Sequence, residues 1–148
     1  FSKFFNTLCR FFCVKPKQGK DPENYIFMRR RYSFAILNLY PYNNGHVLVV
    51  PYRHVRTLQA LTQKDTAALM AHLQECQKLL KELLHPHGYN VGINEGRVAG
   101  AGFKDHIHIH IVPRWNGDTN YMPVLTGTKV ISESLNALYR KINHAQSR

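Results

Sequence analysis

One short alternation of histidine with apolar residues constrains this chain more than any other feature: His106-Ile107-His108-Ile109-His110-Ile111-Val112. Side chains of an extended strand point to opposite faces with a period of two. As a strand, the run therefore places its imidazoles on one face and its isoleucines on the other, whereas a helix would scatter both around its axis. We expect a strand whose isoleucine face packs on a core.

The imidazole face of this strand has two functional interpretations. The histidines can ligate a transition metal, or they can place one neutral imidazole as a nucleophile among supporting groups. A plain polar outer face is the simplest alternative, but three aligned imidazoles are chemically expensive unless something uses them. The residues alone leave the metal and the nucleophile open.

Composition indicates one globular domain with anionic partners. The 148 residues are 44% hydrophobic, enough for a single core, and carry a formal net charge of +11. We expect one domain over residues 1–148, with an amino-terminal arm or helix and loop at 1–22, a core at 23–123 and a carboxyl-terminal helix region at 124–148. No apolar run approaches the roughly 20 residues that span a bilayer. Three cysteines are too few and too unevenly placed for a disulfide framework, which indicates a reducing compartment, and we expect the cytoplasm.

Patterning along the chain predicts an α+β fold with one mostly antiparallel sheet of about five strands and a long helix on one face. The strand candidates are rich in β-branched and aromatic residues and lie at 25–28, 32–39, 46–50, 89–94 and 106–112. A helix begins after Thr62, where Asp65 completes a capping box, and ends at Pro86 and Gly88. Its apolar stripe contains Leu69, Met70, Leu73, Cys76, Leu80, Leu83 and Leu84.

Other residues of the helical regions receive no catalytic role. Cys76 belongs to the apolar stripe, and His72, His85 and His87 are expected to be surface histidines. Ser132 is expected to cap a last helix. The amino end places apolar residues at helical spacing (Phe1, Phe4, Phe5, Leu8, Phe11 and Phe12). We expect a helix or arm packed on the domain or on a partner subunit rather than on a membrane surface.

Three further features surround the histidine row. Asn38 precedes and His46 follows the turn at 41–45, so the two lie close together, either as a ligand-facing pair or with Asn38 capping the turn. The small residues of 95–102 expose main-chain N–H groups that can hold an anion. Trp115 is either a core side chain or a residue that stacks on a base.

Together these motifs resemble the histidine triad (HIT) superfamily, in the branch of diadenosine tetraphosphate phosphorylase and the fragile histidine triad hydrolases. The triad itself is the run at 106–112, and Asn38 with the segment around His46 resembles an earlier motif of the family. The longer matching segments are Leu37-Asn-Leu-Tyr-Pro-Tyr-Asn-Asn-Gly-His, Pro51-Tyr-Arg-His-Val, Ala99-Gly-Ala-Gly and Val112-Pro-Arg-Trp-Asn-Gly-Asp-Thr-Asn. The likeness covers residues 25 to 123.

The resemblance implies a HIT-like fold and a nucleotide hydrolase or transferase that cleaves the α-phosphate bond of dinucleoside polyphosphates or nucleotide adducts. His108 would be the nucleophile and form a nucleotidyl-histidine intermediate, which water or, in a phosphorylase, inorganic phosphate would resolve. His106 and His110 would contact phosphate or protonate the leaving group, and His46 would support the row. Asn38 would hold the ribose. Phosphate would be held by Asn94 and by the main chain near Ala101 and Gly102.

The resemblance also raises a zinc site, from which this chain departs. Many relatives in the branch carry Cys-x-x-Cys near the amino end, together with two histidines equivalent to His54 and His106. Here Arg10 stands at the first cysteine position, Cys13 at the second, and the other cysteine is Cys9. A set of Cys9, Cys13, His54 and His106 stays within zinc spacing. The departure disfavours a structural metal, and we expect no required cofactor.

The residues also allow two other function classes. A metalloenzyme would use His106, His108 and His110 as ligands, and the charge would suit a module that binds nucleotide or nucleic acid. No basic strand face carries interleaved aromatic residues, which disfavours a nucleic-acid partner. We also expect no membrane partner. The family likeness implies a homodimer in which sheets join across the interface.

Overall fold

The computed structural model of the chain describes residues 11–102, 105–119, 127 and 130–147. Its centre is a sheet of five strands in the order β1-β2-β3-β5-β4, in which every neighbouring pair is antiparallel. The strands are β1 (Ile26–Arg29), β2 (Ser33–Leu37), β3 (Val47–Pro51), β4 (Gly88–Gly92) and β5 (Ile109–Arg114). The helices are α2 (Asp21–Asn24), α3 (Gln63–Leu84) and α5 (Leu135–Gln146), with short 3₁₀ turns η1 (Lys15–Lys17), η2 (Leu58–Ala60) and η3 (Arg97–Ala99). The α+β fold and the mostly antiparallel sheet are confirmed.

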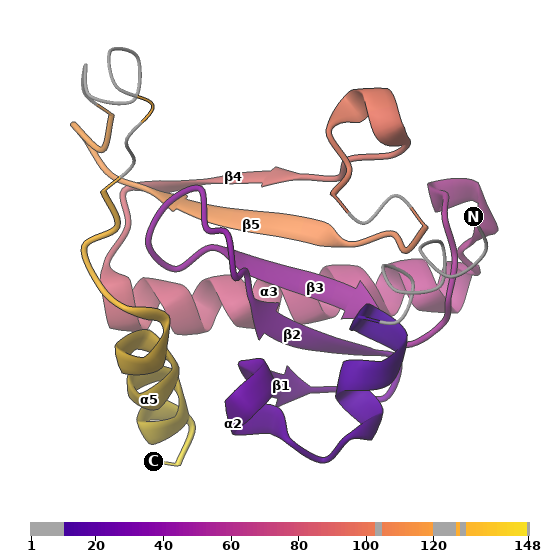
Figure 1. Cartoon of the computed structure of the whole chain (residues 1–148), viewed down its shortest axis with the longest axis horizontal. Helices are drawn as coiled ribbons and strands as arrows, with labels where there is room; N and C mark the ends of the chain where they lie inside the picture. Colours follow the sequence, from indigo (N-terminus) through magenta and orange to yellow (C-terminus); the bar gives the residue numbers. More distant parts are fainter. Residues whose placement is uncertain (1–10, 103–104, 120–126, 128–129, 148) are drawn as a thin grey trace.

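Helix α3 covers one face of the sheet, and the amino-terminal segment lies against the other (Figure 1). On the α3 side, Ile109 and Ile111 of β5 join the apolar side chains of the helix in the larger core cluster. On the opposite side, Phe12, only 1% exposed, packs with Phe34 and Leu48 in a smaller cluster. The first ten residues lie outside the described residues, so the predicted amino-terminal arm is seen only from Phe11 onward.

The predicted capping box starts α3. The Thr62 hydroxyl accepts a hydrogen bond from the Asp65 main-chain N–H, and the Asp65 carboxylate accepts one from the Thr62 main-chain N–H. The helix ends at Leu84, before the expected Pro86, because His85 adopts a left-handed conformation with φ of 48°. The stripe is buried as predicted at Leu69, Leu73, Cys76 and Leu80, but Met70 is 49% exposed.

Two sequence predictions about the helices are wrong. His72 is not a surface residue: it is 1% exposed, and its Nδ1 lies 2.7 Å from the Ser33 hydroxyl on β2. His72 directly precedes Leu73, and both side chains lie on the buried face of α3, which packs against the sheet. The last helix is capped by Ser134, which accepts a hydrogen bond from the Ala137 main-chain N–H, and not by Ser132. Both serines precede the apolar stripe, which explains the two-residue error.

Within the part of the chain that is described, no helix combines the length and the apolar character needed to cross a membrane.

Candidate active site

The histidine row is extended, but only its second half belongs to the sheet. Strand β5 begins at Ile109, because its pairing with β3 extends only from Val47 to Val49. The preceding residues are held by single contacts, among them the Ile107 N–H, which donates to the Val55 carbonyl at 2.8 Å. The predicted strand over 106–112 is therefore too long at its amino end. The alternation continues nonetheless, with the rings of His106 and His108 against Phe12 at 5.6 and 5.2 Å between centroids.

Main-chain carbonyls set the protonation of the first two rings. A carbonyl oxygen only accepts, so His108 Nδ1, 2.8 Å from the His106 carbonyl, carries the proton and donates it. His108 Nε2 is then the unprotonated nitrogen. His106 donates in the same way from Nε2 to the Pro51 carbonyl at 2.9 Å, which leaves Nδ1 as its lone-pair nitrogen. The unprotonated nitrogen is therefore Nδ1 in His106 and Nε2 in His108.

Burial keeps these rings neutral. His106, His108 and His110 are 2%, 3% and 9% exposed. Desolvation is the main cause that lowers the pKa of His106 and of His110 to about 4, and it also lowers the pKa of His108. A ring with such a pKa is unprotonated at neutral pH, which is the form that a nucleophilic nitrogen requires.

His46 and Asn38 complete the row from the β2–β3 connection. His46, 1% exposed, places Nε2 2.9 Å from Nδ1 of His110. The Asn38 amide nitrogen lies 3.3 Å from Nδ1 of His46 and 3.4 Å from its Nε2, so it sits against the ring face. The main chains are also joined, since the Asn38 N–H donates to the His46 carbonyl at 2.9 Å. The pair that the sequence placed on either side of the turn is therefore in contact.

A small apolar cavity opens beside this group on the histidine face of the sheet. It is lined by Phe11, Ile36, Leu37, Asn38, Leu39, Tyr40 and Leu48. Ile36 and Leu48 also contribute to the cluster around Phe12, which fixes the face. An apolar cleft with one carboxamide at its edge has the character of a small-molecule site. The sequence did not mark Phe11, Leu39 and Tyr40 as site residues, because the cavity forms only where the amino-terminal segment meets the end of β2.

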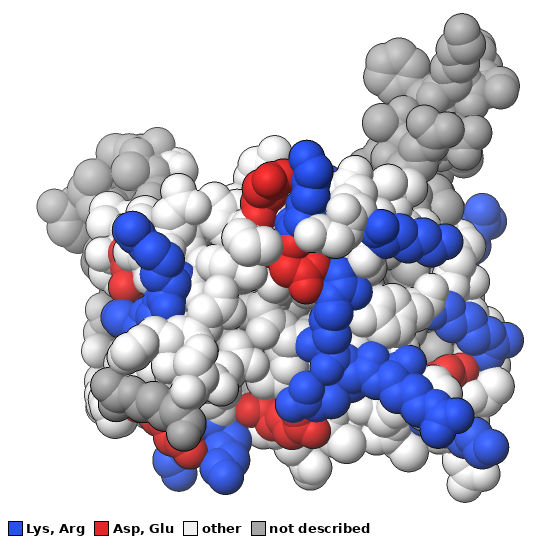
Figure 2. Space-filling view, turned by 90° about the horizontal axis from the view of Figure 1, so that it is seen from below, with Lys and Arg blue, Asp and Glu red and all other residues white. Residues whose placement is uncertain are grey.

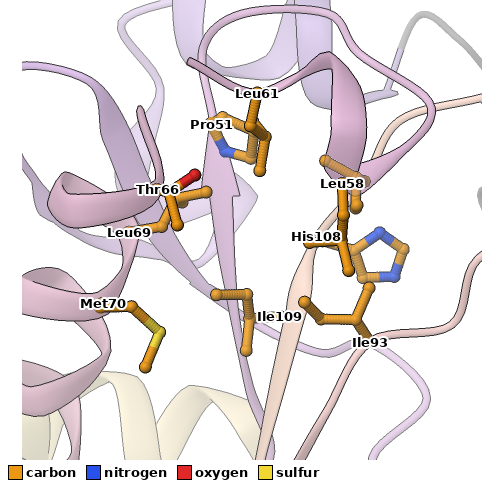
Figure 3. A pocket seen from close by; sticks show the side chains of 10 residues that line it. Pro51, Leu58, Leu61, Thr66, Leu69, Met70, Ile93, His108 and Ile109 are labelled. Carbon is orange, nitrogen blue, oxygen red and sulfur yellow. The ribbon is translucent and has the colours of Figure 1, made fainter. Parts of the chain in front are cut away.

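A larger apolar cavity lies on the opposite face between α3, η2 and β5 (Figure 3). His108 forms part of its wall, but the ring points away from Leu69 and Met70 of α3 (Figure 3). The lining residues are Pro51, Leu58, Leu61, Thr66, Leu69, Met70, Ile93, Ile107, His108 and Ile109. The His108 ring therefore points away from this cavity.

Cys13, His54 and His106 form a second group at the amino end of the row. Cys13 Sγ lies 3.5 Å from His54 Nδ1 and 3.6 Å from His106 Nδ1, and the two Nδ1 atoms are 3.4 Å apart. Bond lengths of about 2.05 Å to nitrogen and 2.3 Å to sulfur around tetrahedral zinc require N–N separations of about 3.3 Å and N–S separations of about 3.6 Å. The three donors fit a zinc ion in both chemistry and spacing. Cys9 and Arg10 lie outside the described residues.

The remaining predicted binding residues lie in the loop before the row or at the far end of β5. Asn94 donates from Nδ2 to the Gly100 carbonyl at 3.4 Å, which ties the loop together; Ala101 is half-buried and Gly102 exposed. Trp115 follows the carboxyl end of β5, where its Nε1–H donates to the Leu84 carbonyl at 3.3 Å. The structure does not bring Trp115 to the row, and stacking on a base stays a prediction for it.

Comparisons with known proteins agree with this fold and row of histidines. The HIT domain family matches residues 19–117, and the chain belongs to this family. It is 46% identical over 118 residues to an "AP-4-A phosphorylase" of Mycobacterium tuberculosis, covering 80% of this chain and 60% of that protein. It is 36% identical over 93 residues to a "Bis(5'-nucleosyl)-tetraphosphatase [asymmetrical]" of Schizosaccharomyces pombe, covering 63% of this chain and 50% of that one. The chain thus spans only about half to three fifths of these relatives.

Among solved structures, the chain resembles a zinc-bound histidine triad family protein from Mycobacterium smegmatis. The TM-score is 0.68, with 28% sequence identity and 84% of each chain covered. Another match is a histidine triad nucleotide-binding protein from Sulfolobus tokodaii, with a TM-score of 0.70, 26% identity, and 94% of this chain and 89% of that one covered. These likenesses confirm the predicted HIT-like fold.

Proposed function

We propose that this chain cleaves dinucleoside polyphosphates at an α-phosphate through a nucleotidyl intermediate on His108. The observation that carries the proposal is the hydrogen bond from His108 Nδ1 to the His106 carbonyl, because it fixes the unprotonated nitrogen on Nε2. The names of the relatives from M. tuberculosis and S. pombe support this substrate class. The net charge of +11, and the face in Figure 2 on which Lys and Arg outnumber Asp and Glu, also suit a polyanion.

The proposed reaction divides one displacement into two. The lone pair on His108 Nε2 attacks the α-phosphorus, a P–N bond forms, and the P–O bond to the departing nucleotide breaks, with its electron pair leaving on oxygen. Water or inorganic phosphate then attacks the same phosphorus and releases His108. The neighbouring groups accelerate these steps only as far as they bind the charge of the transition state better than the substrate.

The acceptor in the second step distinguishes a hydrolase from a phosphorylase. The M. tuberculosis relative, named a phosphorylase, favours phosphate as a second candidate. Incubation with diadenosine tetraphosphate is expected to give ATP with AMP if water is the acceptor, and ATP with ADP if phosphate is. Product chromatography with and without added phosphate decides between them. Absence of any nucleotide release from a panel of dinucleoside polyphosphates would contradict the proposal.

We assign the nucleoside to the apolar cavity on the histidine face. Its lining by Phe11, Leu39 and Leu48 suits a base, and Asn38 at the edge suits a ribose hydroxyl. The main-chain N–H groups around Ala101 and Gly102, with Asn94, are assigned to phosphate oxygens, since the loop presents few side chains. His106 and His110 support the row, and His46 holds His110.

We also propose that Cys13, His54 and His106 hold a structural zinc ion. The donor spacing supports this assignment, and so does the hydrogen bond from His106 Nε2 to the Pro51 carbonyl, which turns the lone pair of Nδ1 toward the other two donors. Zinc would tie the amino-terminal segment to the triad. The thiolate ligand is one reason to propose a reducing, cytoplasmic location.

Substitution of the cysteine should reveal this metal. We expect the protein to contain about one zinc per chain, and Cys13→Ala to lose it and to melt several degrees lower, since a bound metal stabilises only the folded state. Elemental analysis and thermal melts measure both effects. Cys76→Ala, which removes a buried thiol on α3, is the matched control and should retain the zinc. A zinc-free wild-type protein after purification with zinc present would refute the assignment.

We propose a homodimer that uses the edge strand β4. Its outer residues Asn90, Val91 and Gly92 are exposed, and the strand pairs on one side with β5. An open strand edge is a natural site for pairing with a second sheet. Light scattering should give twice the chain mass, and Val91→Lys should shift that mass toward the monomer. A monomeric wild-type protein at micromolar concentration would contradict the dimer.

A further inference from the structure

Tyr42 covers the two histidines at the carboxyl end of the row. It lies in the connection between β2 and β3 and is 49% exposed. Its ring is stacked on His110, with an interplanar angle of 9° and 5.7 Å between centroids. The same ring lies against His46 at 4.5 Å, tilted by 49°. One aromatic side chain therefore restricts both imidazoles from the solvent side.

The main chain of Tyr42 also gives the hydrogen bonds a direction. Its N–H donates to His46 Nδ1 at 2.9 Å, so this nitrogen is the unprotonated acceptor. The proton of neutral His46 is then on Nε2, which donates to His110 Nδ1 at 2.9 Å. His110 Nδ1 is an acceptor in turn, so the proton of His110 is on Nε2. That buried Nε2 has no hydrogen-bond partner among the described residues.

Asn38 makes a further contact with the His46 ring. Its Oδ1 accepts a hydrogen bond from the Tyr40 N–H at 3.0 Å, which orients the carboxamide. The amide nitrogen consequently faces the His46 ring at both ring nitrogens. His46 is thus held by the Tyr42 ring, the Tyr42 main chain and the Asn38 amide.

We propose that Tyr42 is a positioning residue, which through its N–H and its ring locks His46 and His110 into a one-directional hydrogen-bond chain ending in a donor on His110 Nε2. The buried, unpartnered N–H at the end of the chain lies on the ring next to His108, with 4.8 Å between the two centroids. A fixed donor at this place can bind a phosphate oxygen as negative charge develops. This inference rests on the proposed function for its substrate, but the tautomers follow from geometry alone.

Kinetics of two substitutions test the position of the ring. Tyr42→Leu removes the ring, and we expect kcat on diadenosine tetraphosphate to fall about tenfold with little change in KM. Tyr42→Phe keeps the ring and should restore most of kcat. Tyr32→Leu is the matched control, because the Tyr32 ring lies in the β1–β2 turn beside Arg31, 5.3 Å from its guanidinium. Wild-type kcat in Tyr42→Leu, or an increase in KM alone, would overturn the positioning role.

Nitrogen NMR of the histidine rings tests the direction of the hydrogen-bond chain through His46 and His110, and it requires no turnover. In the wild-type protein we expect both His46 and His110 to carry their proton on Nε2, and His108 on Nδ1. In Tyr42→Pro, which removes the main-chain N–H that donates to His46 Nδ1, the His110 signals should shift toward a mixture of tautomers. A wild-type His110 protonated on Nδ1 overturns the inference. If the wild type cleaves no dinucleoside polyphosphate, the proposed function fails. The NMR result still shows whether His46 and His110 form the proposed hydrogen-bond chain.

Discussion

Replacement of His108 by asparagine is expected to lower kcat on dinucleoside polyphosphates by at least about 10³-fold, or about 4 kcal/mol of barrier. Asparagine retains an amide N–H that can donate to the His106 carbonyl, so the local main chain should stay in place. It lacks the nitrogen lone pair that attacks phosphorus. Steady-state kinetics measure the loss, and the melting temperature checks that the variant is folded.

A trapped intermediate separates nucleophilic catalysis from mere binding. Wild-type protein quenched during turnover of substrate labelled in the nucleotide should retain label through an acid-labile P–N bond, and His108→Asn should retain none. His87→Ala changes an exposed histidine beside β4 and serves as the control. Turnover by His108→Asn within tenfold of wild type would exclude His108 as the nucleophile, whatever the other histidines do.

The parts of the fold that depend on periodicity were predictable from the sequence. The two-residue alternation at 106–112 put the imidazoles and isoleucines on opposite faces, and the structure confirms this with Ile109 and Ile111 in the core. The capping box at Thr62 and Asp65 was equally readable, because it depends on residues three apart. The sequence therefore predicts those features that depend on residues a few positions apart.

Contacts between distant segments explain what the sequence did not reveal. The opposite tautomers of His106 and His108 depend on which carbonyls lie beside them, and the Pro51 carbonyl is 55 residues away from His106. The spacing of Cys13, His54 and His106 likewise requires three segments to meet. Arg10 stands where many relatives carry a cysteine, which led the sequence analysis to disfavour a metal. The geometry of Cys13, His54 and His106 favours one.

His72 shows the same limit for the core. A histidine on an amphipathic helix is normally assigned to the polar face, but this ring is buried against β2, with Ser33 at one nitrogen. Its Nε2 has no hydrogen-bond partner among the described residues. Desolvation, with a smaller effect of Arg30, lowers the pKa of His72 to about 4, while Glu75 opposes the change. A buried ring of this kind couples folding to pH.

The structure is therefore expected to lose stability in mild acid. The folded-state pKa lies below the unfolded value of 6.5, so the unfolded chain takes up a proton that the folded chain excludes. The free energy of unfolding should be unaffected above pH 7 and should fall as the pH drops from 6.5 toward 4. For His72 alone the loss is about 2 kcal/mol at pH 5. Buried His106 and His110 act in the same direction.

A paired substitution isolates the contribution of His72. Changing His72→Leu together with Ser33→Ala removes both hydrogen-bonding partners, which costs little when the shape is kept. Urea unfolding at pH 8 and pH 5 should then show a smaller acid loss than wild type, by about 2 kcal/mol. His144→Gln, on the exposed side of α5, should keep the wild-type loss. An equal loss in the paired variant would show that the Ser33–His72 contact does not sense acid and that the triad histidines carry the effect.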